Sequence, residues 1–197
     1  AAAVLCAGAA WFFAGKIPTS FLPEEDQGYL YGAIQLPNAA SLERTEAACQ
    51  KVEQILKETP GINYVTTVVG FNLLSTVQTT YNGFFFITLK PWSEREKPEE
   101  QFTAIRARLA RELSRVPEGI AFTFPPPAIP GVGTSGGFTF VLEDRAGKDV
   151  PFLAQNTERF LEAARKRPEL TGLNTTLLPA VPQVYTQVDR EKALKQG

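Results

Sequence analysis

Few side chains in this 197-residue sequence could do chemistry, and the sequence contains no histidine and no methionine. The commonest general base of proteins and the thioether metal ligand are therefore missing. Glu24, Glu25 and Asp26 are adjacent in one loop, whereas acid–base catalysis needs two carboxylates held apart in a cleft. We therefore predict no catalytic residue, no metal site and no cofactor, and we expect that the chain is not an enzyme.

Two further groups of residues lack the partners that their chemistry would need. The first is a set of hydroxyl side chains, Ser75, Thr76, Thr79 and Thr80, and the second is a set of glycines, Gly131, Gly133, Gly136 and Gly137. The hydroxyls have no histidine that could activate them as nucleophiles. No Lys-Ser/Thr pair follows the glycines, as a phosphate-binding loop would require. Binding is therefore a better candidate than catalysis.

Aromatic side chains dominate the stretch GFNLLSTVQTTYNGFFFITLKPW, in which a polar centre leads into a run of phenylalanines. We predict a loop over residues 72–81 and a strand over residues 82–89. Successive residues of a strand point to opposite faces, so Phe84, Phe85 and Phe86 make both faces of this strand apolar. The strand is either buried on both sides, or it packs a core with one face and contacts an apolar ligand with the other.

The overall composition argues against a nucleic-acid partner. The net charge of −1 and the isoelectric point near 5.7 provide no basic surface. The strand NGFFFITL is similar to the central strand of the RNA-recognition motif, but Asn82 stands where that motif has a basic residue and Phe85 where it has a small one. The two cysteines do not indicate a disulfide framework.

The pattern of apolar residues predicts an α+β fold, a ferredoxin-like sandwich with the order β-α-β-β-α-β and both helices on one sheet. The predicted strands cover residues 28–37, 62–70, 82–89 and 120–124. The first predicted helix begins at Asn38 or Ser41 and ends near Glu58, and the second begins at Ser93 or Pro98 and ends near Val116. In the first strand, Tyr29, Tyr31, Ala33 and Gln35 alternate with Leu30, Ile34 and Leu36. The first helix has an apolar stripe that begins at Leu42, and the arginines near the second helix, Arg95 among them, are expected to form a solvated face.

A linker rich in proline and glycine, residues 125–137, predicts a domain boundary. Beyond it we predict strands over residues 138–142, 173–177 and 184–188 and a helix over residues 151–166. These elements would form an incomplete second β-α-β unit, which chain outside this sequence would have to complete.

The first fourteen residues, AAAVLCAGAAWFFA, carry no charge. They are too few for a complete membrane span, which needs ~20 residues. They could be a signal-peptide core, a buried helix, or the end of a transmembrane helix. We favour the last interpretation, because Trp11, Phe12 and Lys16 stand where aromatic-belt and snorkelling residues belong. Residues 24–26 would then form an acidic tether in water.

Six blocks of the sequence, taken in order, resemble the resistance–nodulation–division (RND) multidrug efflux transporters, and in particular their hydrophobe/amphiphile efflux branch. The blocks are FLPEEDQG, QLPNAASLERT, VVGF, NGFFFITLKPW, FTFPPPAIPGVGTSGGF and PQVYTQVDREKA. The resemblance implies that residues 1–20 are the C-terminal end of a transmembrane helix and its tether. It implies that residues 21–130 are the first porter subdomain of the transporter's second half. Residues 131–197 would be an incomplete second porter subdomain that runs into a docking segment.

The resemblance also implies a substrate-binding site. The counterpart of residues 70–81 is a switch loop between an outer and an inner drug pocket. The implied inner-pocket residues are Val68, Phe71, Leu73, Phe84 and Phe86, and those of the outer pocket and its cleft are Phe122, Phe124, Pro126 and Thr134. Phe85 would point into the subdomain core. The sequence departs from the family at Asn72 and Leu73, in place of Gly and Phe, and at Gly131 and Asn174, in place of an acidic and a basic residue.

The function implied by the resemblance is export of hydrophobic and amphiphilic compounds by a proton-driven pump of the bacterial inner membrane. The pump would work by alternating access, with this segment mostly in the periplasm and the proton-carrying residues elsewhere. A homotrimer, a periplasmic adaptor protein and an outer-membrane channel are implied as partners. The alternative is a membrane-tethered structural or lipid/protein-translocation domain with ferredoxin-like units. Metal transport is disfavoured because the sequence lacks Met and His.

Overall fold

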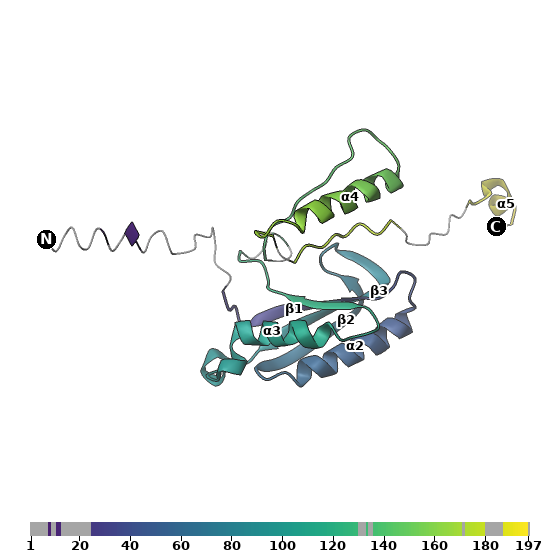
Figure 1. Cartoon of the computed structure of the whole chain (residues 1–197). Helices are drawn as coiled ribbons and strands as arrows, with labels where there is room; N and C mark the ends of the chain where they lie inside the picture. The colour runs from purple at the N-terminus through teal and green to yellow at the C-terminus, as the bar shows by residue number, and fades with distance from the viewer. Residues whose placement is uncertain are drawn as a thin grey trace.

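A four-stranded antiparallel sheet with two helices on one face forms the centre of the structure (Figure 1). The structure is a computed structural model, and it describes residues 8, 11–12, 25–129, 133, 136–170, 172–179 and 187–196. The elements of the sheet and its helices are β1 (Tyr29–Gln35), α2 (Leu42–Lys57), β2 (Ile62–Asn72), β3 (Val77–Leu89), α3 (Phe102–Leu113) and β4 (Ile120–Phe124). The strands lie in the order β2-β3-β1-β4, which confirms a mixed α+β fold.

The hydrophobic core fills the space between the sheet and the helices α2 and α3. In β1 the burial alternates along the strand, with Leu30 and Ile34 fully buried beneath the helices, as the sequence pattern predicted. The helices contribute Ala48, Val52 and Leu56 from α2 and Phe102, Ile105, Leu109 and Leu113 from α3. Leu42 does not extend this stripe, because its side chain is 47% exposed at the start of α2.

A serine caps the start of helix α2, and a threonine just beyond its end bonds back to its last turn. The Ser41 side chain accepts a hydrogen bond from Arg44 N at 3.3 Å, which satisfies one of the free amides of the first turn. After the last turn, Thr59 Oγ1 donates to the carbonyl of Ile55 at 2.8 Å. Helix α3 is shorter than predicted, because two 3-10 turns, η1 (Trp92–Glu94) and η2 (Pro98–Glu100), precede it.

The predicted loop over residues 72–81 is wrong, because most of it is a β-hairpin. Strand β2 continues to Asn72 and β3 begins at Val77, so only residues 73–76 connect them. The β-branched residues of this polar run suit an extended backbone, and the ladder between the strands satisfies their amides. A bulge lies between Val69 and Phe71, where Gly70 adopts the left-handed conformation (φ 85°) that a bulge of this kind requires.

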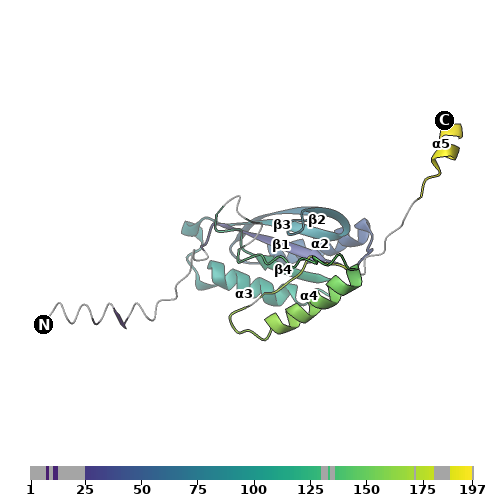
Figure 2. The same cartoon turned by 90° about the horizontal axis from the view of Figure 1, so that it is seen from above.

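The second predicted unit retains its helix but not its strands. Helix α4 (Val150–Ala164) lies on the side of the sheet opposite α2 and α3 (Figure 1). Seen from above, it lies next to the edge strand β4 (Figure 2). Residues 138–142 and 173–177 form no strand, and residues 184–186 lie outside the described part of the chain. A strand needs a neighbouring backbone to accept and donate its hydrogen bonds, and residues 138–142 and 173–177 pair with no strand in the described part of the chain.

The N-terminal prediction falls almost entirely outside the described residues. Of residues 1–20, the structure describes only Gly8, Trp11 and Phe12, all three in helical conformation. No helix in the described part of the chain is long and apolar enough to cross a membrane. At the C-terminal end, α5 (Arg190–Gln196) is a short exposed helix.

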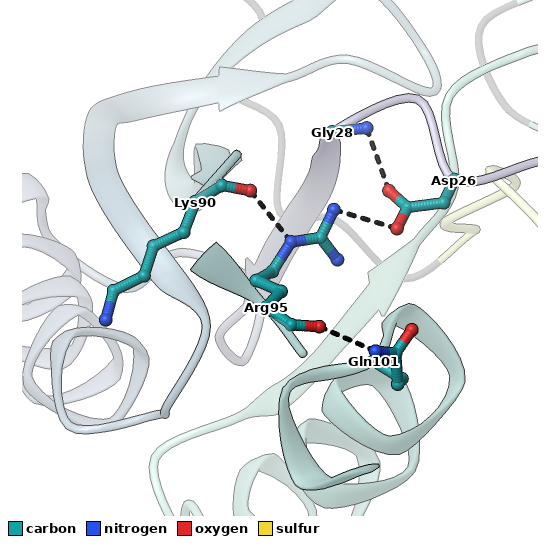
Figure 3. A network of polar contacts seen from close by, with 5 residues as sticks. All are labelled: Asp26, Gly28, Lys90, Arg95 and Gln101. Carbon is teal, nitrogen blue, oxygen red and sulfur yellow. Dashed lines mark hydrogen bonds and ion pairs between the residues drawn. The ribbon is translucent and has the colours of Figure 1, made fainter. Parts of the chain in front are cut away.

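The acidic tether and the solvated arginine face were each predicted wrongly at one position. The Asp26 carboxylate accepts a hydrogen bond from Gly28 N at 2.9 Å, and its other oxygen lies 2.8 Å from Nη2 of Arg95 (Figure 3). The Arg95 side chain is only 1% exposed. Its Nε donates to the carbonyl of Lys90 at 2.8 Å, and Gln101 Nε2 donates to the carbonyl of Arg95 at 2.6 Å. The start of the domain is thereby attached to the connection between β3 and α3.

Candidate functional site

Two rows of side chains cross the sheet on the face that α2 and α3 do not cover. The register places Phe86, Tyr31 and Phe124 side by side on β3, β1 and β4. The next row contains Val68, Phe84, Ala33 and Phe122. Because neighbouring residues of a strand point to opposite faces, these side chains lie away from the buried Leu30 and Ile34. The face is therefore aromatic along most of its width.

The rings of this face contact one another, mostly edge to face. We define the aromatic face as Tyr31, Phe71, Phe84, Phe86, Phe122 and Phe124. The ring centroid of Tyr31 lies 5.4 Å from that of Phe84 and 5.7 Å from those of both Phe86 and Phe124. The remaining ring pairs are Phe84–Phe86 at 4.7 Å, Phe122–Phe124 at 5.8 Å and Phe71–Phe84 at 6.3 Å. Such pairs contribute about 0.5–1.5 kcal/mol each beyond the burial of their surface.

The three consecutive phenylalanines of β3 have three different environments. Phe85 is fully buried in the core beneath the helices, which confirms the prediction that it points inward. Phe84 is also fully buried, but on the other face, where its neighbours are Tyr31, Phe71 and Phe86. Phe86 is 44% exposed. A ligand on this face could therefore contact Phe86 directly, whereas Phe84 supports the rings around it.

The other predicted site residues are distributed around this face. Phe122 and Phe124 are half-buried on β4, and Pro126 is buried just beyond that strand. Leu73 is half-buried in the connection between β2 and β3. Thr134, like Gly131 of the predicted hinge, lies outside the described residues. The structure thus brings Phe71, Phe84, Phe86, Phe122 and Phe124 into one surface.

A groove of about 490 Å³ lies along the β2–β3 hairpin, next to the aromatic face. Its lining consists of Leu42, Val68, Val69, Gly70, Phe71, Gln78, Thr79 and Thr80. The apolar lining residues come from α2 and β2, whereas Gln78, Thr79 and Thr80 of β3 contribute an amide and two hydroxyls. No charged side chain lines the groove. Only Val68 and Phe71 of the predicted residues line the groove, so the groove extends the aromatic face and does not coincide with it.

Tyr31 is the functional candidate that sequence reasoning missed. It contacts three rings of the aromatic face and stands at the centre of its row. The alternation in β1 had already separated Tyr31 from the core residues, and this was the available signal. Burial raises the pKa of its phenol, with a smaller contribution from the nearby Tyr29, so Tyr31 is neutral at physiological pH.

The described part of the chain contains neither a cluster of metal ligands nor an activated cysteine. It contains no cluster of three His, Cys, Asp or Glu side chains that could hold a metal ion. The Cys49 thiol is 1% exposed, and burial, with smaller contributions from Glu53 and Glu46, raises its pKa to about 11. A thiol in this state is protonated at neutral pH and is a poor nucleophile.

The fold and the site together define an α+β protein whose sheet packs a core with one face and presents aromatic side chains on the other. The chain belongs to the AcrB/AcrD/AcrF family, whose sequence model matches residues 1–197. This membership confirms the resemblance to RND transporters.

Several curated proteins are similar to the whole chain. The toluene efflux pump membrane transporter TtgB of Pseudomonas putida is 36% identical over 197 residues, which are 99% of this chain and 18% of the relative. The multidrug resistance protein MdtF of Escherichia coli K12 is 36% identical over 98% of this chain and 19% of its own length. The multidrug export protein AcrF of the same Escherichia coli strain is 36% identical over 92% of this chain and 18% of its own length. The chain spans about a fifth of the length of these relatives, and none of their names describes an enzyme.

Proposed function

We propose that this chain is the periplasmic substrate-binding porter portion of a proton-driven multidrug efflux pump of the bacterial inner membrane. The pump exports hydrophobic and amphiphilic compounds by alternating access. Family membership supports this proposal, as do the names of the relatives, which describe a toluene efflux pump and a multidrug export protein. In this interpretation, residues 1–20 end a transmembrane helix, residues 21–130 form the first porter subdomain and residues 131–197 begin the second.

The layout of the first subdomain supports the same proposal. We infer that it is a ferredoxin-like sandwich, because the strand order β2-β3-β1-β4 is antiparallel throughout and α2 and α3 cover one face. Helices α2 and α3 leave the second face of the sheet to the aromatic side chains, and α4 lies on that side. The exposed part of this face is available to a ligand or to another part of the transporter. Rocking of such a unit as a rigid body would open and close that face.

The observation that carries the proposal is the aromatic face, with Phe86 44% exposed above a fully buried Phe84. Rings contribute large apolar contact areas without requiring one pattern of hydrogen bonds, which suits ligands of varied structure. Val68, Phe71, Leu73 and Phe86 would contact a ligand in an inner pocket, with Phe84 behind them. Phe122, Phe124, Pro126 and Thr134 would belong to an outer pocket. A homotrimer, a periplasmic adaptor and an outer-membrane channel would complete the pump.

The test is accumulation of a fluorescent lipophilic cation in cells that make the full-length transporter containing this chain. We compare the parent with the Phe71→Ala/Phe86→Ala double variant at equal protein level. The expected result is low accumulation with the parent and high accumulation with the double variant. Trp92→Ala is the matched control, because Trp92 is 65% exposed on η1, outside the aromatic face, and its loss should leave accumulation low.

Two outcomes would count against the proposal in different ways. Equal export by the parent and the double variant would show that the aromatic face is not the ligand site, although the protein is a pump. If the parent exported none of several chemically different dyes, the substrate class would be wrong. The alternative of a membrane-tethered structural or lipid/protein-translocation domain would then become the better account.

A further inference from the structure

Two asparagines connect the tip of the β2–β3 hairpin to the body of the sheet. Asn72, the last residue of β2, accepts hydrogen bonds through Oδ1 from Leu74 N at 2.9 Å and from Ser75 N at 3.2 Å. Its Nδ2 donates to Oδ1 of Asn82 at 3.4 Å. Asn82 in turn donates through Nδ2 to Thr79 Oγ1 at 2.6 Å. We call Asn72, Asn82 and Thr79 the amide relay.

The amide relay is partly shielded from water, so the loss of one of its hydrogen bonds would be costly. Asn82 is only 3% exposed, so water cannot readily replace a lost protein partner of its amide. A buried polar group without a partner is costly, whereas a satisfied network favours one arrangement of the chain. The relay also provides the acceptor for two backbone amides of the connection between the strands. The ladder of β2 and β3 ends at the pair Asn72–Val77, so it does not supply this acceptor.

The hairpin that the relay holds is also the segment that shapes the groove. Phe71 precedes Asn72 and packs edge to face on Phe84, with 6.3 Å between ring centroids. Thr79 belongs both to the relay and to the groove lining, which also includes Val68 and Phe71. A displacement of the hairpin tip would therefore move groove-lining residues of both β2 and β3.

We infer that Asn72 and Asn82 are positioning residues that hold the hairpin as a fixed arm, so that Phe71 and the groove are in place before a ligand arrives. The fixed arm is a property of the fold alone, and its effect on export rests on the proposed function. The pairing also explains why the polar run after Asn72 is a hairpin with a four-residue connection instead of a loop.

Hydrogen exchange tests the fixed arm in the full-length transporter, purified in detergent and read out by mass spectrometry with fragmentation of peptides that cover residues 71–82. In the parent, the amides of Leu74 and Ser75 should exchange more slowly than in an unstructured peptide. In Asn72→Ala they lose their acceptor, and we expect exchange to accelerate roughly 2- to 12-fold, the range expected for one hydrogen bond. Ser75→Ala is the matched control, since no hydrogen bond of its hydroxyl contributes to the relay, and it should exchange like the parent.

A second variant separates the two parts of the relay. Asn72→Asp retains an acceptor for the amides of Leu74 and Ser75 but cannot donate to Asn82. Those two amides should stay slow, while the amides of residues 79–82 should exchange faster. Exchange in the parent at the rate of an unstructured peptide would overturn the inference, and so would identical exchange in the parent and in Asn72→Ala.

Export of the fluorescent lipophilic cation then tests the consequence for ligands. If the fixed arm prepares the groove, Asn72→Ala should raise the concentration of cation needed for half-maximal export, with its protein level unchanged. Faster exchange together with unaltered export would overturn the positioning role. Failure of the proposed function is a separate result, because it would appear as unchanged export by the Phe71→Ala/Phe86→Ala variant and would leave the exchange rates as they are.

Discussion

The ring of Tyr31 meets the ring of Phe86 edge to face, with 5.7 Å between centroids and 85° between planes, and the two residues are direct partners across β1 and β3. Tyr31 stands between Phe86 and Phe124, so it supports the exposed ring of the aromatic face from the side. Support of this kind lets a partly exposed Phe86 keep one orientation.

Removal of the Tyr31 ring should therefore weaken export even if Tyr31 does not contact the ligand. For Tyr31→Ala we expect the apparent affinity of the full-length transporter for a lipophilic cation to fall roughly 2- to 12-fold, equivalent to the loss of one aromatic contact. Tyr31→Phe should behave like the parent, because it keeps the ring. Concentration-dependent dye export measures both. Equal losses in the two variants would assign the effect to the hydroxyl and contradict this explanation.

The Asp26–Arg95 pair should contribute more to stability than an ordinary surface ion pair. Arg95 is nearly inaccessible, and Asp26 is 23% exposed, so Asp26→Ala leaves a buried guanidinium without its counter-charge. Breaking a buried pair in this way costs about 3–5 kcal/mol, and the partial exposure of Asp26 places the expected value at the lower end. Faster hydrogen exchange in Asp26→Ala across residues 26–30 and 90–101 of the full-length protein would show this loss of stability. Arg111→Ala, at an exposed position on α3, should change exchange little.

Gly83 should not tolerate a side chain. A Cβ atom at this position would lie 2.3 Å from Cys49 Sγ and 3.0 Å from Ile34 Cγ2. We expect Gly83→Ala to destabilise the domain by roughly 1–3 kcal/mol, as overpacking of a core does. Cys49→Ala should recover part of this loss, because it removes the nearer atom. A melting temperature of the double variant at or below that of Gly83→Ala would contradict the proposed steric cause.

The buried Cys49 thiol predicts a loss of stability at alkaline pH. Its pKa is raised to about 11 in the folded protein, from an ordinary value of 9.0, by burial first and by nearby carboxylates second. Above about pH 9 the unfolded chain releases the thiol proton while the folded chain retains it, so unfolding becomes more favourable as the pH rises toward 11. Thermal unfolding from about pH 8 to about pH 10.5 should show a steeper decline for the parent than for Cys49→Ala. Parallel declines would exclude Cys49 as the cause.

Local residue patterns were sufficient to predict the mixed α+β fold and the direction of side chains along the central strands. The alternation in β1 separated Leu30 and Ile34 from Tyr31. Once the family resemblance had placed Phe84 and Phe86 toward a pocket, the same rule placed Phe85 on the core side of β3. These predictions succeed because the direction of a side chain along a strand depends on local backbone geometry alone. The family resemblance likewise depends only on the order of residues.

The pairing and burial of the polar residues could not be predicted from local patterns, because they depend on contacts between distant parts of the chain. The polar run after Asn72 is a hairpin in which β3 pairs with the backbone of β2, and the side chain of Asn82 accepts a hydrogen bond from Asn72. Neither partner can be recognised in the local sequence pattern. Asp26 and Arg95 became a buried pair although each belongs to a charged stretch of sequence. Residues 138–142 have a strand-like composition but no paired neighbour in the described structure, so they form no strand. Pairing, burial and charge neutralisation all depend on residues that are distant in the chain, and only the folded structure brings those residues together.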